Sequence, residues 1–82
     1  MDRLTLFKAL SDKTRLSIVS LLLDGEKCVC EIFPHVKRTQ STVSTQLGKL
    51  EKWGILKSRR QGKWMFYSIK DKRIYSIFKA VR

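Results

Sequence analysis

The segment from Lys37 to Gly54, KRTQSTVSTQLGKLEKWG, carries an apolar repeat of helical period that stops at a glycine. Val43, Leu47 and Leu50 recur at i, i+4 and i+7, which predicts a helix with one apolar face. The first turns of the opposite face carry uncharged donors and acceptors: Gln40, Ser41, Ser44, Thr45 and Gln46. Such side chains suit hydrogen bonding to base edges in the DNA major groove. For this helix alone, an amphipathic helix with an uncharged solvent-facing side is an equally good interpretation.

Two helices are expected before this segment. In the first, Leu4, Phe7 and Leu10 lie on one side at i, i+3 and i+6, and the helix ends near Asp12. Its apolar stripe is exposed unless another surface covers it. The second helix extends to Gly25, and its broad apolar face predicts the central helix of the core.

A short third helical segment follows Gly25. We expect Pro34 to interrupt it, because proline lacks a backbone donor and biases the preceding residue away from the helical region. A turn through Lys37 and Arg38 then leads to Thr39, the expected N-cap of the longer helix. Short helix, tight turn and longer helix are the parts of a helix-turn-helix motif.

A β-hairpin and a last helix are expected after Gly54. The hairpin joins an extended segment, Ile55 to Arg60, to the aromatic and β-branched run WMFYSI through a turn at Gln61-Gly62-Lys63. The last helix begins at Asp71, and its apolar stripe consists of Ile74, Ile77, Phe78 and Val81. The predicted fold is mainly α with a small β-hairpin. It is a winged helix-turn-helix of order α-α-α-α-β-β-α, in which residues 1–82 form a single DNA-binding domain.

The net charge of the chain restricts its partners. Lys and Arg outnumber Asp and Glu by 18 to 7, which gives +11 in 82 residues, and an anionic partner would offset the resulting self-repulsion. Eight cations and one acid lie between Lys37 and Lys63, on the helix of the opening segment and the hairpin. A membrane-surface helix is disfavoured, because the apolar positions of this helix are needed for the core. We therefore expect double-stranded DNA as the partner and no membrane.

Other classes of protein find little support. No apolar run approaches the roughly 18 residues that span a bilayer, and the N-terminus lacks the core of a signal peptide, so we expect a cytoplasmic protein. With one histidine, no paired carboxylates and no glycine-rich phosphate loop, the sequence predicts no enzyme and no catalytic residue. A nucleic-acid or protein-interaction module without a role in transcription remains the alternative, since fold does not fix function.

The predicted DNA contacts fall into two groups. Cations neutralise phosphates and make the affinity salt-dependent, whereas the uncharged helix face reads bases, with Gln40 and Gln46 able to form bidentate bonds to adenine. The hairpin contacts the backbone or the minor groove. The predicted DNA-binding residues are Lys37, Arg38, Thr39, Gln40, Ser41, Thr42, Ser44, Thr45, Gln46, Lys49, Arg59, Arg60, Gln61 and Lys63.

Four segments, in order, resemble the ArsR/SmtB family of winged-helix metal- and redox-sensing repressors. LFKALSDKTRLSIVSLLLDGE resembles its first two helices, CVCEIF its metal-box segment, TQSTVSTQLGKLEKWGIL its recognition helix and RRQGKWMFYSI its wing. The chain departs from the family at Gln46, where His is frequent, and at Lys13, where Pro is frequent. The resemblance implies a repressor that binds an imperfect palindromic operator in a promoter until an inducer releases it.

The same resemblance implies a homodimer held mainly by the first and last helices. This would cover the two apolar stripes that the sequence leaves without a partner, although both could instead close the core of the monomer. The implied dimer-interface residues are Leu4, Phe7, Leu10, Ile74, Ile77, Phe78 and Val81.

Cys28 and Cys30 lie where arsenic and cadmium sensors of the family carry a Cys-x-Cys pair. Thiolates are natural ligands of soft ions, and a helix N-terminus favours the thiolate form. Residues two apart point to opposite sides of a regular helix, so both sulfurs reach one ion only where the backbone is extended. Inducer binding would then distort the segment that precedes the reading helix.

The sequence leaves the inducer open. Phe33 stands where a third cysteine is found in some sensors, so the third ligand would be a solution thiol or water, His35, or a cysteine of another subunit. The last helix lacks the His/Asp pattern of zinc and nickel sensors. No cofactor is required, and arsenite or a soft divalent metal such as cadmium is the expected inducer. A redox switch through a strained, easily reduced disulfide, or no sensing at all, are the alternatives.

Overall fold

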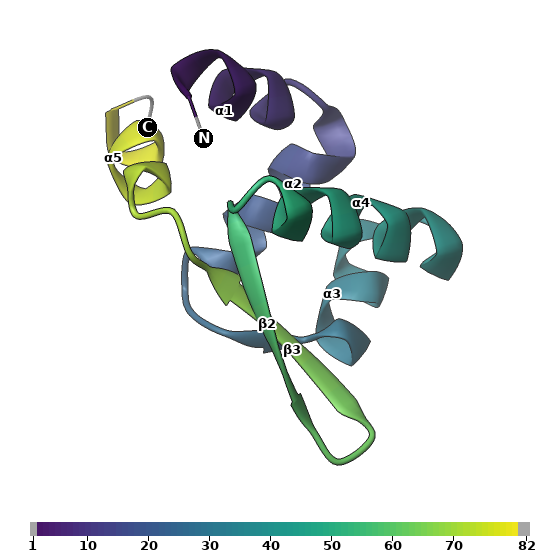
Figure 1. Ribbon diagram of the computed structural model, residues 1–82. Helices are drawn as coiled ribbons and strands as arrows, with labels where there is room; N and C mark the ends of the chain where they lie inside the picture. Colours follow the sequence, from purple (N-terminus) through teal and green to yellow (C-terminus); the bar gives the residue numbers. More distant parts are fainter. Residues whose placement is uncertain (1, 81–82) are drawn as a thin grey trace.

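The computed structural model describes residues 2–80 and confirms the predicted winged helix-turn-helix (Figure 1). Five helices surround a three-stranded antiparallel sheet in place of the simple hairpin that was expected. Val81, the last residue of the predicted terminal stripe, lies outside the described residues. The elements are α1 (Arg3–Leu10), α2 (Lys13–Leu22), β1 (Lys27–Cys28), α3 (Val29–Val36), α4 (Gln40–Lys52), β2 (Leu56–Gln61), β3 (Trp64–Ile69) and α5 (Arg73–Ala80).

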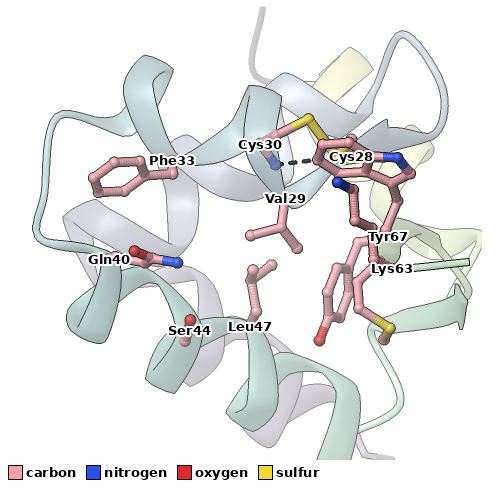
Figure 2. Close-up of a pocket in the computed structure, with 11 residues that line it drawn as sticks. Cys28, Val29, Cys30, Phe33, Gln40, Ser44, Leu47, Lys63 and Tyr67 are labelled. Atoms are coloured by element: carbon pink, nitrogen blue, oxygen red, sulfur yellow. Dashed lines mark hydrogen bonds between the residues drawn. A yellow bond between two sulfur atoms is a disulfide. The ribbon is translucent and has the colours of Figure 1, made fainter.

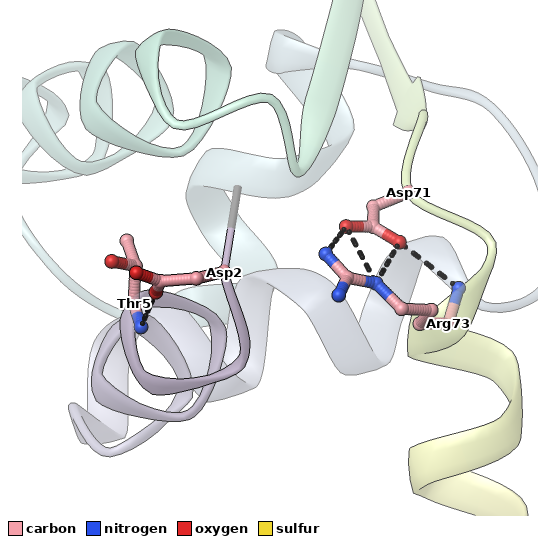
Figure 3. Close-up of polar contacts among 4 residues, drawn as sticks. All are labelled: Asp2, Thr5, Asp71 and Arg73. Atoms are coloured by element: carbon pink, nitrogen blue, oxygen red, sulfur yellow. Dashed lines mark hydrogen bonds and ion pairs between the residues drawn. The ribbon is translucent and has the colours of Figure 1, made fainter.

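The helices begin at side chains that accept hydrogen bonds from otherwise unpaired backbone N–H groups. Asp2 caps α1 through the amide of Thr5 at 2.8 Å (Figure 3), and Thr39 caps α4 through the amide of Thr42 at 3.1 Å. Gly54 follows α4 with φ +80°, a conformation that favours glycine over residues with a Cβ. The predicted start and end of the reading helix are therefore confirmed.

The predicted interruption of α3 at Pro34 is wrong, because the helix continues through Pro34 to Val36. The proline removes only the bond that its N–H would have donated to the carbonyl four residues earlier. Burial of Ile32 and Val36 and a capping box between Cys28 and Glu31 hold the helix on both sides of the proline. The packing of Ile32 and Val36 thus outweighs the preference of the residue before proline for a non-helical backbone.

Strand β1 was not predicted, since only two residues form it. It pairs antiparallel with β3, with Lys27 opposite Tyr67 and Cys28 opposite Phe66, and the strand order is β1-β3-β2. This pairing fixes the N-terminus of α3 to the wing, which consists of β2, β3 and their turn at Gly62. Cys28 therefore belongs to the sheet and to the start of α3 at once.

The core lies around α2, as its broad apolar face predicted. Ile18, Val19 and Leu22 of this helix are fully buried and pack with side chains from the other helices and the sheet. None of the helices in residues 2–80 is long and apolar enough to cross a membrane. The buried hydrophobic cluster comprises Leu6, Ala9, Ile18, Val19, Leu22, Ile32, Val36, Val43, Leu47, Leu50, Ile55, Leu56, Ile69 and Ile74.

Helices α1 and α5 lie together at the end of the molecule away from the wing tip (Figure 1). The predicted stripe of α1 faces outward, with Leu4 77% and Phe7 53% exposed, because the helix buries Leu6 and Ala9 on its other side. The residues of the predicted α5 stripe differ in how deeply they are buried. Ile74 is fully buried in the core of its own chain, so its predicted place in a dimer interface is corrected. Leu10, Ile77 and Phe78 are partly buried against the same core.

Candidate nucleic-acid interface

Helix α4 presents two different faces. Val43, Leu47 and Leu50 are buried against the core, and this burial fixes the rotation of the helix about its axis. Thr42 is half-buried and its Oγ1 accepts a 2.9 Å bond from Thr39 Oγ1 at the start of the helix. The exposed side chains of this helix that were predicted to contact DNA are Gln40, Ser41, Ser44, Thr45 and Lys49.

The structure places Gln46 differently from the rest of the predicted set. Its Oε1 accepts a 2.9 Å bond from Arg15 Nη1 of α2, and Gln46 is half-buried. Arg15 also donates through Nε to the Ala9 carbonyl at 2.8 Å, and its guanidinium lies 5.3 Å from the ring centroid of Trp53. Gln46 therefore connects α4 to α2. This pairing was not predictable from the sequence, because the two residues are 31 positions apart.

The two adjacent wing arginines lie on opposite faces of β2, since successive side chains of a strand alternate. Arg59 forms a bidentate ion pair with Glu26, at 2.7 and 2.8 Å, and stacks 4.6 Å from the ring centroid of Phe66. The hydrogen bond between them raises the pKa of Arg59 and lowers the pKa of Glu26. Arg60 shares its face with Ser58, whose hydroxyl donates to Glu51 of α4 at 2.6 Å. Arg60 is thus the wing arginine on the side of α4.

The turn before α4 and the tip of the wing supply further exposed cations. Lys37 ends α3 in the left-handed region, with φ +58°, and Arg38 follows it in the turn before Thr39. Lys63 lies in the turn of the wing, with its ammonium 5.3 Å from the ring centroid of Trp64. Lys37 and Arg38 thus precede the exposed face of α4, and Lys63 lines a hollow together with Gln40 and Ser44 of that face.

A hollow of about 550 Å³ lies between α3, α4 and the wing (Figure 2). Most of its lining is apolar, and its polar groups come from the reading face of α4 and from the tip of the wing. The sequence did not predict it, because its walls come from three separate segments. The lining residues are Cys28, Val29, Cys30, Phe33, Gln40, Ser44, Leu47, Lys63, Trp64, Met65 and Tyr67.

The two cysteines meet at the start of α3, where a disulfide joins them. Their Cα atoms are 5.1 Å apart because Cys28 is the extended N-cap residue, with ψ 147°, while Cys30 belongs to the helix. This extended backbone at Cys28 is what allows the two sulfurs to lie on the same side. Cys28 is 5% exposed and its Sγ accepts a 3.2 Å bond from the amide of Cys30, which is exposed.

A metal site with three protein ligands does not form within residues 2–80: no three His, Cys, Asp or Glu side chains gather there in a suitable arrangement. His35, one of the proposed third ligands, lines a separate hollow with residues of α2, among them Ser17 and Ser20. It does not line the hollow beside the cysteine pair. Within one chain, Cys28 and Cys30 are therefore the thiol groups that a soft ion would meet.

The comparisons with known proteins agree with this architecture. The model of the family of bacterial regulatory proteins named arsR matches residues 12–58, which span the second helix to the start of the wing. This chain belongs to the ArsR family. The crystal structure of the transcriptional repressor BigR from Xylella fastidiosa superposes with a TM-score of 0.88 at 36% identity, covering 93% of this chain and 78% of that one. The homodimeric winged helix-turn-helix domain of Mb0332 from Mycobacterium bovis gives a TM-score of 0.80 at 32% identity, covering 92% and 69%.

Relatives from sequence comparison support the same assignment. The HTH-type transcriptional regulator MJ1325 of Methanocaldococcus jannaschii is 47% identical over 93% of this chain and 86% of its own length. A homolog of the cadmium resistance regulator CadC from Staphylococcus aureus is 41% identical over 90% of this chain, and the arsenical resistance operon repressor of Escherichia coli is 45% identical over 78%. The matched part spans only 62% and 56% of those two proteins. This ArsR-family chain is a DNA-binding transcriptional regulator, and its family and fold are those of such regulators and not of enzymes.

Proposed function

We propose that residues 1–82 act as a single DNA-binding domain that binds a palindromic operator as a homodimer and is released by a thiol-directed inducer. The observation that carries the DNA-binding part is the exposed uncharged face of α4 between two groups of cations. Gln40, Ser41, Ser44 and Thr45 read bases in the major groove. Lys37, Arg38, Lys49, Arg60 and Lys63 bind phosphates, and Thr39 and Thr42 hold the start of α4 beside the backbone.

Three of the predicted DNA-binding residues receive other or smaller roles in this proposal. Gln46 positions α4 through Arg15 instead of reading a base, since its carbonyl oxygen is already bonded. Arg59 and Gln61 contribute less than Arg60, because Arg59 donates to both Glu26 and Gln61 at 2.7 to 3.0 Å. Loss of these bonds would offset part of any gain from a new phosphate contact.

The dimer forms through the end of the molecule that carries α1 and α5. Leu4 and Phe7 are exposed there, and Ile77 and Phe78 are only partly covered by their own chain. A domain of about this size buries only roughly 60% of the surface of its unfolded chain, so a second subunit adds useful stability. The homodimeric state of the Mb0332 domain supports the formation of a dimer.

The expected inducer is arsenite or a soft divalent metal such as cadmium, which binds the thiolates of Cys28 and Cys30 after reduction of the disulfide. Two relatives are an arsenical resistance repressor and a homolog of a cadmium resistance regulator, which supports this choice. A further ligand would come from solution or from another subunit, since residues 2–80 offer no third group. A redox switch is the second candidate, favoured by the meeting of both sulfurs at the start of α3.

Footprinting on DNA that flanks the chain's own coding region tests the operator. We expect protection of a palindrome whose half-sites lie about one helical turn, or a multiple of it, apart. Uniform affinity for any duplex would contradict the repressor mechanism proposed here.

Titration of the reduced protein on operator DNA tests the inducer. Arsenite, cadmium and an oxidant are added in turn, and the double variant Cys28→Ser/Cys30→Ser is the matched control. We expect release of the unsubstituted protein by at least one of them and none from the variant. If no reagent releases the DNA, the cysteine pair is not the switch.

A further inference from the structure

The hollow between α3, α4 and the wing has the properties of a small-molecule site. Its volume of about 550 Å³ lies within the range of about 300 to 1,000 Å³ typical of ligand pockets. Phe33, Trp64 and Tyr67 give it an aromatic lining, and Lys63 is the one charged residue among those that line it. Such a lining matches a ligand with an aromatic body and a single negative charge.

The two sulfurs at this hollow are not equivalent. Cys30 is exposed, so a nucleophile from solution reaches its Sγ, whereas Cys28 is 5% exposed. Cys28 Sγ also accepts the amide N–H of Cys30 at 3.2 Å, at the start of an eight-residue helix. Both the hydrogen bond and the helix N-terminus stabilise negative charge on sulfur. Cys28 is therefore the better leaving group and Cys30 the better point of attack.

We propose that this hollow takes a low-molecular-weight aromatic thiol bearing a carboxylate, which forms a mixed disulfide with Cys30. The proposal rests on the role of this cysteine pair as the switch and names a further class of ligand for it. The ligand thiolate attacks Cys30 Sγ, a new S–S bond forms, and the bond between Cys28 and Cys30 breaks with its electron pair on Cys28 Sγ. One disulfide replaces another, so the step needs no oxidant or reductant.

The position of the hollow connects this adduct to DNA binding. Gln40 and Ser44 of the α4 reading face and Lys63 of the wing line it together with Cys30 (Figure 2). The carboxylate pairs with Lys63, and the aromatic body lies beside Gln40 and Ser44. The same three side chains would then no longer reach bases and phosphate. Ligand and operator compete, and each weakens the other by the same factor.

Adduct formation without DNA tests the proposal. The full chain in its disulfide form is incubated with an excess of 3-mercaptobenzoate or of its counterpart without the carboxylate, thiophenol. The reaction is quenched with iodoacetamide, and the products are measured by intact mass and peptide mapping. We expect the adduct on Cys30, with a several-fold preference for the thiol that bears the carboxylate. Lys63→Met should abolish this preference, and Lys57→Met, which removes a wing cation outside this hollow, should leave it unchanged.

Equal yields with the two thiols in the unsubstituted protein would overturn the proposal. An adduct on Cys28, simple reduction without an adduct, or the same effect from both lysine variants would overturn it as well. Thermal unfolding of each variant checks that the fold is retained. The adduct is measured without operator DNA. If no adduct forms, the proposed repressor function is not contradicted, and if the protein does not bind an operator, the adduct measurement is still valid.

Discussion

Arg59 and Arg60 show how far neighbouring residues of one charge pattern can differ in their surroundings. Arg59 is paired with Glu26 and stacked on Phe66, so DNA must compete with contacts that already exist. No hydrogen bond or ion pair joins Arg60 to any residue between 2 and 80, and it lies on the side of the wing that faces α4. Equal charge therefore does not imply equal contributions to binding.

We expect Arg60→Met to weaken binding to all DNA sequences and to reduce the slope of log affinity against log salt by about one, the loss of one phosphate contact. Arg59→Met is the matched control, with a smaller change in slope because its cation is already neutralised by Glu26. Fluorescence anisotropy titrations at several salt concentrations measure both slopes. A larger effect for Arg59 would contradict the assignment of the two wing faces.

Gln40 is expected to contribute sequence discrimination, since it is exposed in the first turn of α4 and its amide can form a bidentate pair with adenine. Gln40→Ala should weaken operator binding by about 1 to 3 kcal/mol and leave affinity for non-operator DNA nearly unchanged. Paired titrations on the two DNAs measure the difference. Equal losses on both would show that Gln40 does not read bases.

At the scale of elements, Arg15 joins three helices. Its guanidinium, on α2, donates to the Ala9 carbonyl at the end of α1. It also contacts Gln46 of α4 and Trp53 at the C-terminal end of that helix. We expect Arg15→Met to lower the free energy of unfolding by about 1 to 3 kcal/mol, the range for lost hydrogen bonds to a charged group in a partly buried position. Urea unfolding measures this loss.

Arg3→Met provides the control for Arg15, because Arg3 is an exposed cation of α1. Its substitution should change the free energy of unfolding by less than about 0.5 kcal/mol. Operator affinity should fall only for the Arg15 variant, since α4 loses its fixed position. Similar results for both variants would show that total charge, not the contacts of Arg15, determines the outcome.

The start of α5 depends on an ion pair that responds to pH. Arg73 donates to the Asp71 carboxylate through its side chain and its backbone N–H (Figure 3), and these bonds lower the pKa of Asp71. A carboxyl with a lowered pKa in the folded state stabilises the fold above its unfolded pKa. This contribution is lost as the pH falls through the folded pKa. Asp71→Asn should therefore lower stability at neutral pH and flatten its acid dependence, measured by unfolding at a series of pH values.

The sequence predicted those elements whose cause is local. The apolar spacing of Val43, Leu47 and Leu50 predicted which side of α4 faces the core. Thr39 and Gly54 predicted where this helix begins and ends. Features that depend on distant partners were not predictable. Strand β1 exists only because β3 lies beside it, and Gln46 turns inward only because Arg15 reaches it from α2.

At the scale of the whole molecule, the basic wing tip lies far from the exposed apolar side chains of α1 (Figure 1). In Figure 1 the wing tip lies at one end of the molecule, and α1 with α5 lies at the other. Two copies that meet through α1 and α5 would therefore direct both wings outward. The cations of the wing tip are kept away from the contact in such a dimer, whereas Arg3, Lys8, Arg73 and Lys79 of α1 and α5 stay near it.

Phe7→Glu tests this arrangement, because it places a charge in the proposed contact at a residue that is 53% exposed and outside the chain's own core. We expect a monomer in analytical ultracentrifugation with an unchanged circular dichroism spectrum. Operator affinity should fall by roughly 100-fold, since the two half-sites are no longer bound by linked domains. Affinity for a single half-site should change much less.

Leu16→Glu is the matched control, with the same change of charge at a leucine of α2 that is 41% exposed. It should remain a dimer and keep its operator affinity, because Leu16 does not belong to the surface formed by α1 and α5. If Phe7→Glu stays dimeric, the contact lies elsewhere. If both variants become monomeric, a charged side chain at any exposed leucine or phenylalanine is enough to disrupt the dimer, and the exposed stripe of α1 has no special part in it.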